Sequence, residues 1–251
     1  MKSSLSTTKR RIMVDVAVES LRLPRRDLVI QAGFLALIAA ILTVDARRNT
    51  LAPFDRPLID AIQRIDLPFL TPIINGVDTL TSSTWAIALW GVALVAMLAV
   101  RWWVPALAVL AMPWGGFANN MIGTYVVTRT RPEDDTLLRT LGEVDAPSFP
   151  SGHVMGAVML YGFLLYLLPR MRHYGVRRAF LMTSLAIIPM VGFGRIWVGA
   201  HWPSDVLAAY AMGGLVVVLL IMLVEQVEHS LATLAARFSL PDWVSPFSRP
   251  R

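Results

Sequence analysis

The stretch Phe149-Pro150-Ser151-Gly152-His153 places a hydroxyl, a free backbone amide and an imidazole directly before the apolar run Val154–Leu168. A helix that opens at Ser151 leaves its first N–H groups without intrahelical partners, and the helix dipole adds partial positive charge at the same end. Such an end attracts an anion. Ser151 taken alone is most simply an N-cap. The stretch therefore predicts a helix whose start is either capped or holds an anion.

The composition is that of a membrane protein. Of the 251 residues, 55% are hydrophobic and 16% are charged, and the mean hydropathy is +0.58. The absence of cysteine excludes disulfides, thiolate metal sites and a cysteine nucleophile. The formal net charge of +6 comes from basic residues at the ends of apolar runs. This distribution favours membrane topology over nucleic-acid binding.

Apolar segments recur along the chain at lengths close to those of membrane-spanning helices. They predict an all-α, integral-membrane bundle of six transmembrane helices. Residues 1–27 are expected to form a basic cytoplasmic segment whose following span is retained, residues 28–224 the six-span domain, and residues 225–251 a cytoplasmic tail. The six segments are Leu28–Val44, Thr84–Val100, Val104–Val127, Val154–Leu168, Ala179–Gly194 and Val206–Val224.

The distribution of arginine and lysine predicts the orientation in the membrane. The basic N-terminus, the cluster between residues 170 and 178 and the arginines of the C-terminal tail are expected to be cytoplasmic. The connection at residues 45–83 mixes both signs of charge and argues weakly against this orientation. We expect a bacterial cytoplasmic membrane, with both termini inside and the functional site on the outer side.

Two further segments have recognisable patterns. Phe54, Leu58, Ile62 and Ile65 recur at helical spacing among polar residues, which predicts an amphipathic helix. Periodicity leaves open whether this helix lies at the membrane interface or caps the bundle. In the third span, Asn119-Asn120 is a polar pair at membrane depth, for which interhelical hydrogen bonding is the favoured interpretation.

Three segments that are expected to face outward contain the candidate catalytic and binding residues. They are Thr128-Arg129-Thr130-Arg131-Pro132, Ser151-Gly152-His153, and the run from Gly194-Arg195 to His201-Trp202-Pro203-Ser204-Asp205. Taken singly, Arg131 is a cation at a helix end and His201 belongs to an interfacial anchor. Those separate readings do not explain why two of the four histidines share one side with two arginines and an aspartate.

His201 and Asp205 form a predicted pair. Pro203 suits the first helical position, which places Asp205 in the first turn, where its carboxylate is able to accept one ring N–H of His201. The other ring nitrogen is then unprotonated, as a nucleophile or base requires.

These residues resemble the three motifs of the type 2 phosphatidic acid phosphatase superfamily, whose fold is shared with vanadium haloperoxidases. The matching elements are Arg131-Pro132, Pro150-Ser151-Gly152-His153, and Arg195 with His201 and Asp205. The resemblance implies a metal-independent lipid phosphate phosphatase without a cofactor, in which His201 attacks phosphorus, Asp205 orients it and His153 protonates the leaving oxygen. It also implies that Arg131, Arg195, Ser151 and Gly152 hold the phosphoryl oxygens. Implied substrates are phosphatidic acid, phosphatidylglycerol phosphate or polyprenyl diphosphates.

The chain departs from the motifs at two positions. Thr124 occupies the place of the first motif's lysine, and Gly194 that of the serine usual before Arg195. Losing a lysine removes a phosphate-binding cation, for which Arg129 is a candidate replacement.

The departures leave alternatives open. A phosphotransferase with an alcohol acceptor and a catalytically silent lipid-phosphate binder both fit the pattern. A serine hydrolase built on Ser151, His201 and Asp205 is disfavoured, because the G-x-S-x-G elbow is absent and both arginines would be unused. Metal binding by His153, His201 and Asp205 is disfavoured because the neighbouring arginines would repel a dication.

Overall fold

The structure is a computed structural model that describes residues 24–132, 137–140 and 146–238. Most of the expected cytoplasmic lead and the part of the tail after Phe238 lie outside these residues.

Every regular element in the described part of the chain is helical, so the all-α expectation is confirmed there. A π-helical segment, η1 (Ile122–Val127), and a 3-10 turn, η2 (Leu168–Arg170), accompany the α-helices. The α-helices are α2 (Arg25–Arg48), α3 (Ala52–Gln63), α4 (Leu70–Thr81), α5 (Ser83–Ala99), α6 (Trp103–Met121), α7 (Gly152–Leu167), α8 (Tyr174–Trp197) and α9 (Pro203–Phe238).

All six predicted apolar segments lie in helices, but fewer qualify as spans. By length and composition, α2, α7 with η2, α8 and α9 are able to cross a membrane, and α4 with α5 adds a fifth span if the pair, bent by 61°, is counted as one. α6 falls outside this set because Pro113, Gly115-Gly116 and Asn119-Asn120 lower its hydropathy. The described helices therefore give an integral membrane protein with four or five candidate spans, where six were expected.

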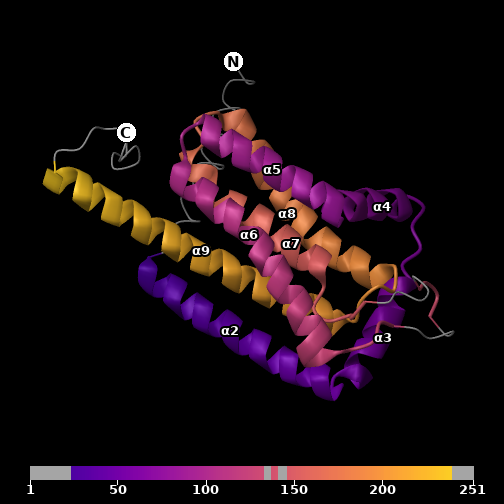
Figure 1. Cartoon of the computed structure of the whole chain (residues 1–251). Coiled ribbons are helices and arrows are strands. Elements are labelled where there is room, and N and C mark those ends of the chain that lie inside the picture. Colours follow the sequence, from indigo (N-terminus) through magenta and orange to yellow (C-terminus); the bar gives the residue numbers. More distant parts are fainter. Residues whose placement is uncertain (1–23, 133–136, 141–145, 239–251) are drawn as a thin grey trace.

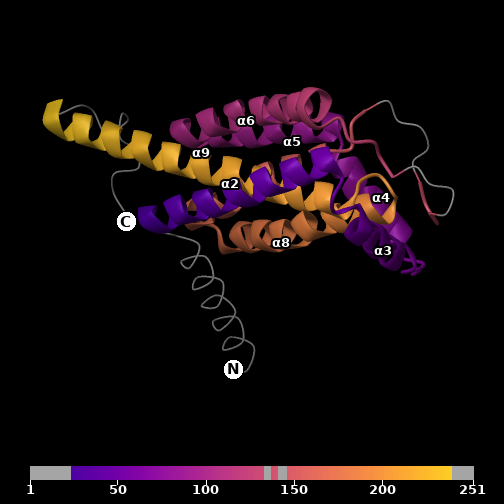
Figure 2. The same ribbon diagram turned by 90° about the horizontal axis from the view of Figure 1, so that it is seen from below.

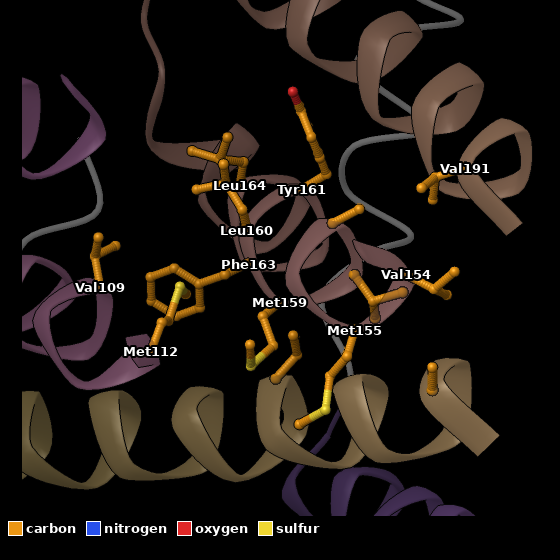
Figure 3. Close-up of a cluster of buried hydrophobic side chains, with 14 of the residues drawn as sticks. Val109, Met112, Val154, Met155, Met159, Leu160, Tyr161, Phe163, Leu164 and Val191 are labelled. Atoms are coloured by element: carbon orange, nitrogen blue, oxygen red, sulfur yellow. The ribbon is translucent and has the colours of Figure 1, made fainter. Parts of the chain in front are cut away.

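α7 lies at the centre of the bundle. It packs against α8 and α9 and also contacts α4, α5 and α6, and its sequence is apolar on all sides, as expected for a helix surrounded by protein. Phe163 of α7 lies beside Val109 and Met112 of α6 in the buried cluster shown in Figure 3. This packing fixes the start of α7, which carries Ser151-Gly152-His153, relative to its neighbours.

The two ends of the described chain lie at the same end of the bundle. α2 and α9 run side by side, and the start of α2 and the last turns of α9 lie opposite α3 and α4 (Figure 1). Arg25 Nη1 donates to Gln226 Oε1 at 2.6 Å across this pair. α9 continues past Val224, so the expected domain boundary at residues 224/225 falls inside one continuous helix.

α3 presents two different faces. Phe54 and Leu58 are 72% and 47% exposed, whereas Asp55, Ile59 and Gln63 on the other side are almost completely buried. The buried side packs against α8 and α9, and α3 covers the end of the bundle near α4 (Figure 2). The predicted amphipathic helix is therefore present, and it caps the bundle: Phe54 and Leu58 face outward, whereas Ile62 of the predicted apolar stripe packs against the core.

Candidate active site

Residues from all three motif segments line one cavity. It has a volume of about 520 Å³, and Arg131, Gly152, His153, Arg195 and His201 form part of its wall. They come from the segment after η1, the first turn of α7, the last turn of α8 and the loop before α9. The structure thus brings together five of the residues that the sequence analysis assigned to one site.

The two cavity arginines are held by different partners. Arg131 donates from Nη1 to the Ala200 carbonyl oxygen at 2.9 Å and from Nε to the Ala146 carbonyl oxygen at 3.1 Å. Arg195 is buried, and its Nη1 donates to the carboxylate of Asp78 on α4. Asp78 also lies 3.8 Å from His153 Nε2. Asp78 therefore contacts the group expected to bind phosphate and lies beside the group expected to act as the acid.

The start of α7 resembles the predicted anion site more than a capped end. Ser151 is the N-cap residue, but its side chain makes no capping hydrogen bond. Its hydroxyl is completely buried and has no hydrogen-bond partner among the described residues. Ser151 does not itself line the cavity, whereas the next two residues, Gly152 and His153, do. The helix start therefore leaves a buried hydroxyl beside a cavity that contains two arginines.

The predicted contact between Asp205 and His201 is wrong. Pro203 does begin α9, and Asp205 lies in its first turn as expected. However, His201 Nδ1 lies 2.6 Å from the Ser148 carbonyl oxygen, and Asp205 accepts a hydrogen bond from the Ser148 hydroxyl instead. The other partners of the Asp205 carboxylate are the Trp202 amide, at 3.1 Å, and Arg129 Nη1, at 2.7 Å.

Ser148 nevertheless gives His201 the form that a nucleophile needs. With Nδ1–H donating to the carbonyl, the proton is absent from Nε2, and His201 lines the cavity. Burial lowers the pKa of the His201 imidazole well below its ordinary value, and the guanidinium groups of Arg195 and Arg131 lower it further. His201 is therefore neutral at physiological pH.

The expectation that Arg129 replaces the missing lysine is also wrong. Arg129 is buried, and both of its terminal nitrogens are bonded away from the cavity: Nη1 to Asp205 Oδ1 at 2.7 Å, Nη2 to Asp55 Oδ2 at 2.7 Å. Thr124 lies exposed in η1 and is not part of the cavity wall. Between them, Arg129 and Thr124 supply no cation to the site.

The rest of the cavity is mainly apolar. Trp90 of α5 and Met159 of α7 contribute to its wall, together with Gly116 of α6. Asn119 and Asn120 line it as well, and Asn119 Nδ2 donates to the Pro150 carbonyl oxygen at 3.4 Å. Asn119 therefore bonds to the segment that leads into α7, and both residues have a place at the cavity.

Three residues that contact the motif side chains were not predicted from the sequence: Ser148, Asp78 and Asp55. Ser148 lies just before the central motif, so its closeness to the motif was an available signal. Asp78 and Asp55 lie far from every motif in the sequence, and nothing local distinguishes them from solvated acids. In the described residues, no group of three potential metal-ligating side chains occurs.

An all-helical membrane bundle with two arginines and two histidines around one cavity defines a class of membrane-embedded, phosphate-directed proteins. Within that class, the chain belongs to the PAP2 superfamily, whose family model matches residues 102–228.

Individual relatives agree with this assignment. The chain is 27% identical over 183 residues to phosphatidylglycerophosphatase B of Bacillus subtilis, which covers 72% of this chain and 85% of that protein. It is 28% identical over 118 residues to lipid A 1-phosphatase of Rhizobium etli, covering 45% of this chain and 47% of the relative. The fold matches the crystal structure of a transmembrane PAP2-type phosphatidylglycerolphosphate phosphatase from Bacillus subtilis with a TM-score of 0.68, at 24% identity, over 78% of this chain and 96% of that one.

Proposed function

We propose that this protein is a metal-independent lipid phosphate phosphatase that works through a phosphohistidine on His201. The observation that carries the proposal is the neutral, buried His201 imidazole in a cavity wall that it shares with Arg131 and Arg195. Two guanidinium groups match the oxygens of a phosphoryl group and stabilise the charge that develops on them during transfer.

In the first step, the lone pair on His201 Nε2 attacks phosphorus. The new P–N bond forms while the bond from phosphorus to the ester oxygen of the lipid breaks, and His153, protonated once the anionic phosphate group is bound beside it, gives its proton to that oxygen. Arg131 and Arg195 bind the equatorial oxygens, so the phosphoryl group replaces Asp78 as the partner of Arg195. The products are the dephosphorylated lipid and phosphohistidine.

In the second step, water releases the phosphate. His153, now neutral, removes a proton from water, and the oxygen of that water attacks phosphorus while the P–N bond breaks. The electron pair returns to His201 Nε2, inorganic phosphate leaves, and His153 is again protonated. Both residues end in the state in which they began.

The apolar wall supports a lipid substrate over a soluble phosphate ester. Trp90, Gly116 and Met159 extend the cavity between α5, α6 and α7, where an acyl or prenyl chain is able to bind next to the phosphate. We place the site on the outer side of a six-span bundle, with both termini in the cytoplasm. The substrate class that we propose is a lipid mono- or diphosphate, of the kinds named for the family.

The decisive experiment measures phosphate release by the purified full-length protein from a panel of lipid mono- and diphosphates in EDTA. Hydrolysis in the wild type, its loss in His201→Ala and inhibition by vanadate are the expected results. Full activity in His201→Ala would refute the proposal, as would vanadate that does not compete with substrate.

A silent lipid-phosphate binder is the second candidate, and a specific observation favours it. The cation lost at Thr124 is not replaced by Arg129, and Asp78 lies on Arg195. This candidate predicts vanadate binding without turnover and without a phosphohistidine after trapping under non-acidic conditions. The phosphatase proposal predicts both turnover and the trapped intermediate.

A further inference from the structure

A group of buried charges lies at the start of α9, close to His201 in the chain, and none of its members lines the cavity. Arg129 joins two carboxylates, with Nη2 at 2.7 Å from Asp55 Oδ2 and Nη1 at 2.7 Å from Asp205 Oδ1. All three side chains are at least nine-tenths buried. The group therefore contains two negative charges and one positive charge in a region from which water is excluded.

This group is connected to the nucleophile by hydrogen bonds. Asp205 accepts a hydrogen bond from the Ser148 hydroxyl, and the carbonyl oxygen of the same Ser148 accepts the bond from His201 Nδ1 at 2.6 Å. A continuous path thus runs from Asp55 through Arg129, Asp205 and Ser148 to the imidazole.

Asp55 also holds the first turn of α9. Its Oδ1 accepts a hydrogen bond from the Ser204 backbone amide at 2.9 Å, and its Oδ2 accepts one from the Ser204 hydroxyl at 2.6 Å. Ser204 is the residue before Asp205. The Asp55 carboxylate on α3 therefore holds both the Arg129 guanidinium, which pairs with Asp205, and the backbone next to Asp205.

Stability alone does not account for such a group, since buried ion pairs are often no more stabilising than apolar residues of similar size. Its location suggests another use. When His201 attacks phosphorus, positive charge develops on an imidazole that is neutral beforehand. A fixed group with one net negative charge, connected to Nδ1 through Ser148, stabilises that charge without rearranging.

We propose that Asp55 is a positioning residue for the His201 nucleophile, acting through Arg129, Asp205 and Ser148. The inference rests on the proposed phosphatase function and deepens it, because it assigns a role to α3, which lies outside the family-matched residues 102–228. Asp55 touches neither the cavity nor the phosphoryl group, so its effect is on the rate of attack and not on binding.

The test compares full-length variants in the same lipid phosphate assay. Asp55→Asn removes the charge but keeps the shape, and Ser148→Ala cuts the path at an uncharged link. Both are expected to lower kcat by about 10- to 100-fold, the range found when a group that orients a ligand through hydrogen bonds is removed. KM and the vanadate inhibition constant are expected to stay within about 2-fold, because Arg131 and Arg195 are unchanged.

The matched control is Glu228→Gln. Glu228 accepts two hydrogen bonds from Arg170, at 2.6 and 2.8 Å, in a partly buried pair toward the far end of the bundle. Its variant loses a carboxylate–guanidinium pair of the same kind and is expected to keep wild-type kcat. With kcat expressed per vanadate-binding site, loss of folded protein does not imitate the predicted effect.

Two outcomes would overturn the inference: wild-type kcat in Asp55→Asn and Ser148→Ala, or a loss of turnover that only parallels a loss of vanadate binding. The phosphatase proposal fails differently, through an inactive wild type or an active His201→Ala. If the wild type is active and His201→Ala is not, the phosphatase proposal stands, and the result for Asp55→Asn then tests only the role of Asp55.

Discussion

Gly199, two residues before the proposed nucleophile, is the position where a single methyl group should disturb the site most. Its φ of 72° lies in the left-handed region, which costs a residue with a side chain about 1–2 kcal/mol. A Cβ at Gly199 would also lie 2.1 Å from the Arg139 carbonyl oxygen, where ordinary contact begins at 3.4 Å. The loop or its neighbour must therefore move by about 1.3 Å, the difference between these distances.

That movement occurs next to a hydrogen bond that fixes the His201 backbone, because the His201 amide donates to the Arg195 carbonyl oxygen at 3.3 Å across the same turn. A displacement of about 1 Å at a catalytic group is able to cost about 100-fold in rate. We expect Gly199→Ala to lower kcat/KM by about this factor and to destabilise the fold by about 1–3 kcal/mol.

The assay is phosphate release from a lipid phosphate, with a thermal unfolding curve for each variant. Gly91→Ala in α5 is the control, since no atom lies within 4 Å of its added Cβ. Wild-type kcat/KM in Gly199→Ala, at an unchanged unfolding temperature, would refute the reasoning from backbone conformation to the site.

Three further predictions concern the cavity and its charges. The pKa of His201 lies below its unfolded value of about 6.5, so the unfolded state binds more protons below that pH and stability falls as the pH drops. The difference in unfolding temperature between about pH 7.5 and about pH 5 should accordingly be smaller in His201→Gln than in the wild type. Asp78→Asn removes the carboxylate that pairs with Arg195 and should tighten vanadate inhibition by about 5-fold, equivalent to ~1 kcal/mol for a partly exposed ion pair. Asp60→Asn on α3 is the control. Weaker inhibition in Asp78→Asn would contradict the idea that Asp78 and vanadate compete for Arg195. Gly116→Leu adds a side chain to the apolar wall and should raise KM for long-chain substrates by about 10-fold, whereas KM for a short water-soluble phosphate ester should stay unchanged. An equal rise in KM for both substrates would contradict the idea that this wall binds the lipid chain.

The sequence predicted which segments line the cavity because each motif directly adjoins an apolar run. Helix ends of a membrane bundle meet at its two ends, so the segments containing Arg131, His153 and His201 had to share one of them once the spans were counted. The start of α9 at Pro203 followed from local chemistry in the same way.

The hydrogen-bond and ion-pair partners of these residues could not be predicted from the sequence, because they depend on distances in the folded protein. Arg129 and Arg131 are two residues apart in a Thr-Arg-Thr-Arg repeat, yet one faces two buried carboxylates and the other lines the cavity. The same limit explains Asp205, whose carboxylate is within reach of its neighbours in sequence but bonds to Ser148 and Arg129 instead of the His201 ring.

Phe54 and Asp55 are consecutive residues of α3 with opposite surroundings, since one is 72% exposed and the other 3%. The aromatic ring of Phe54 is exposed, as an interfacial residue of a membrane protein would be, whereas the Asp55 carboxylate accepts a hydrogen bond from the Ser204 amide at the start of α9. One short helix therefore joins an outward-facing apolar surface to the turn that begins α9, two residues after His201.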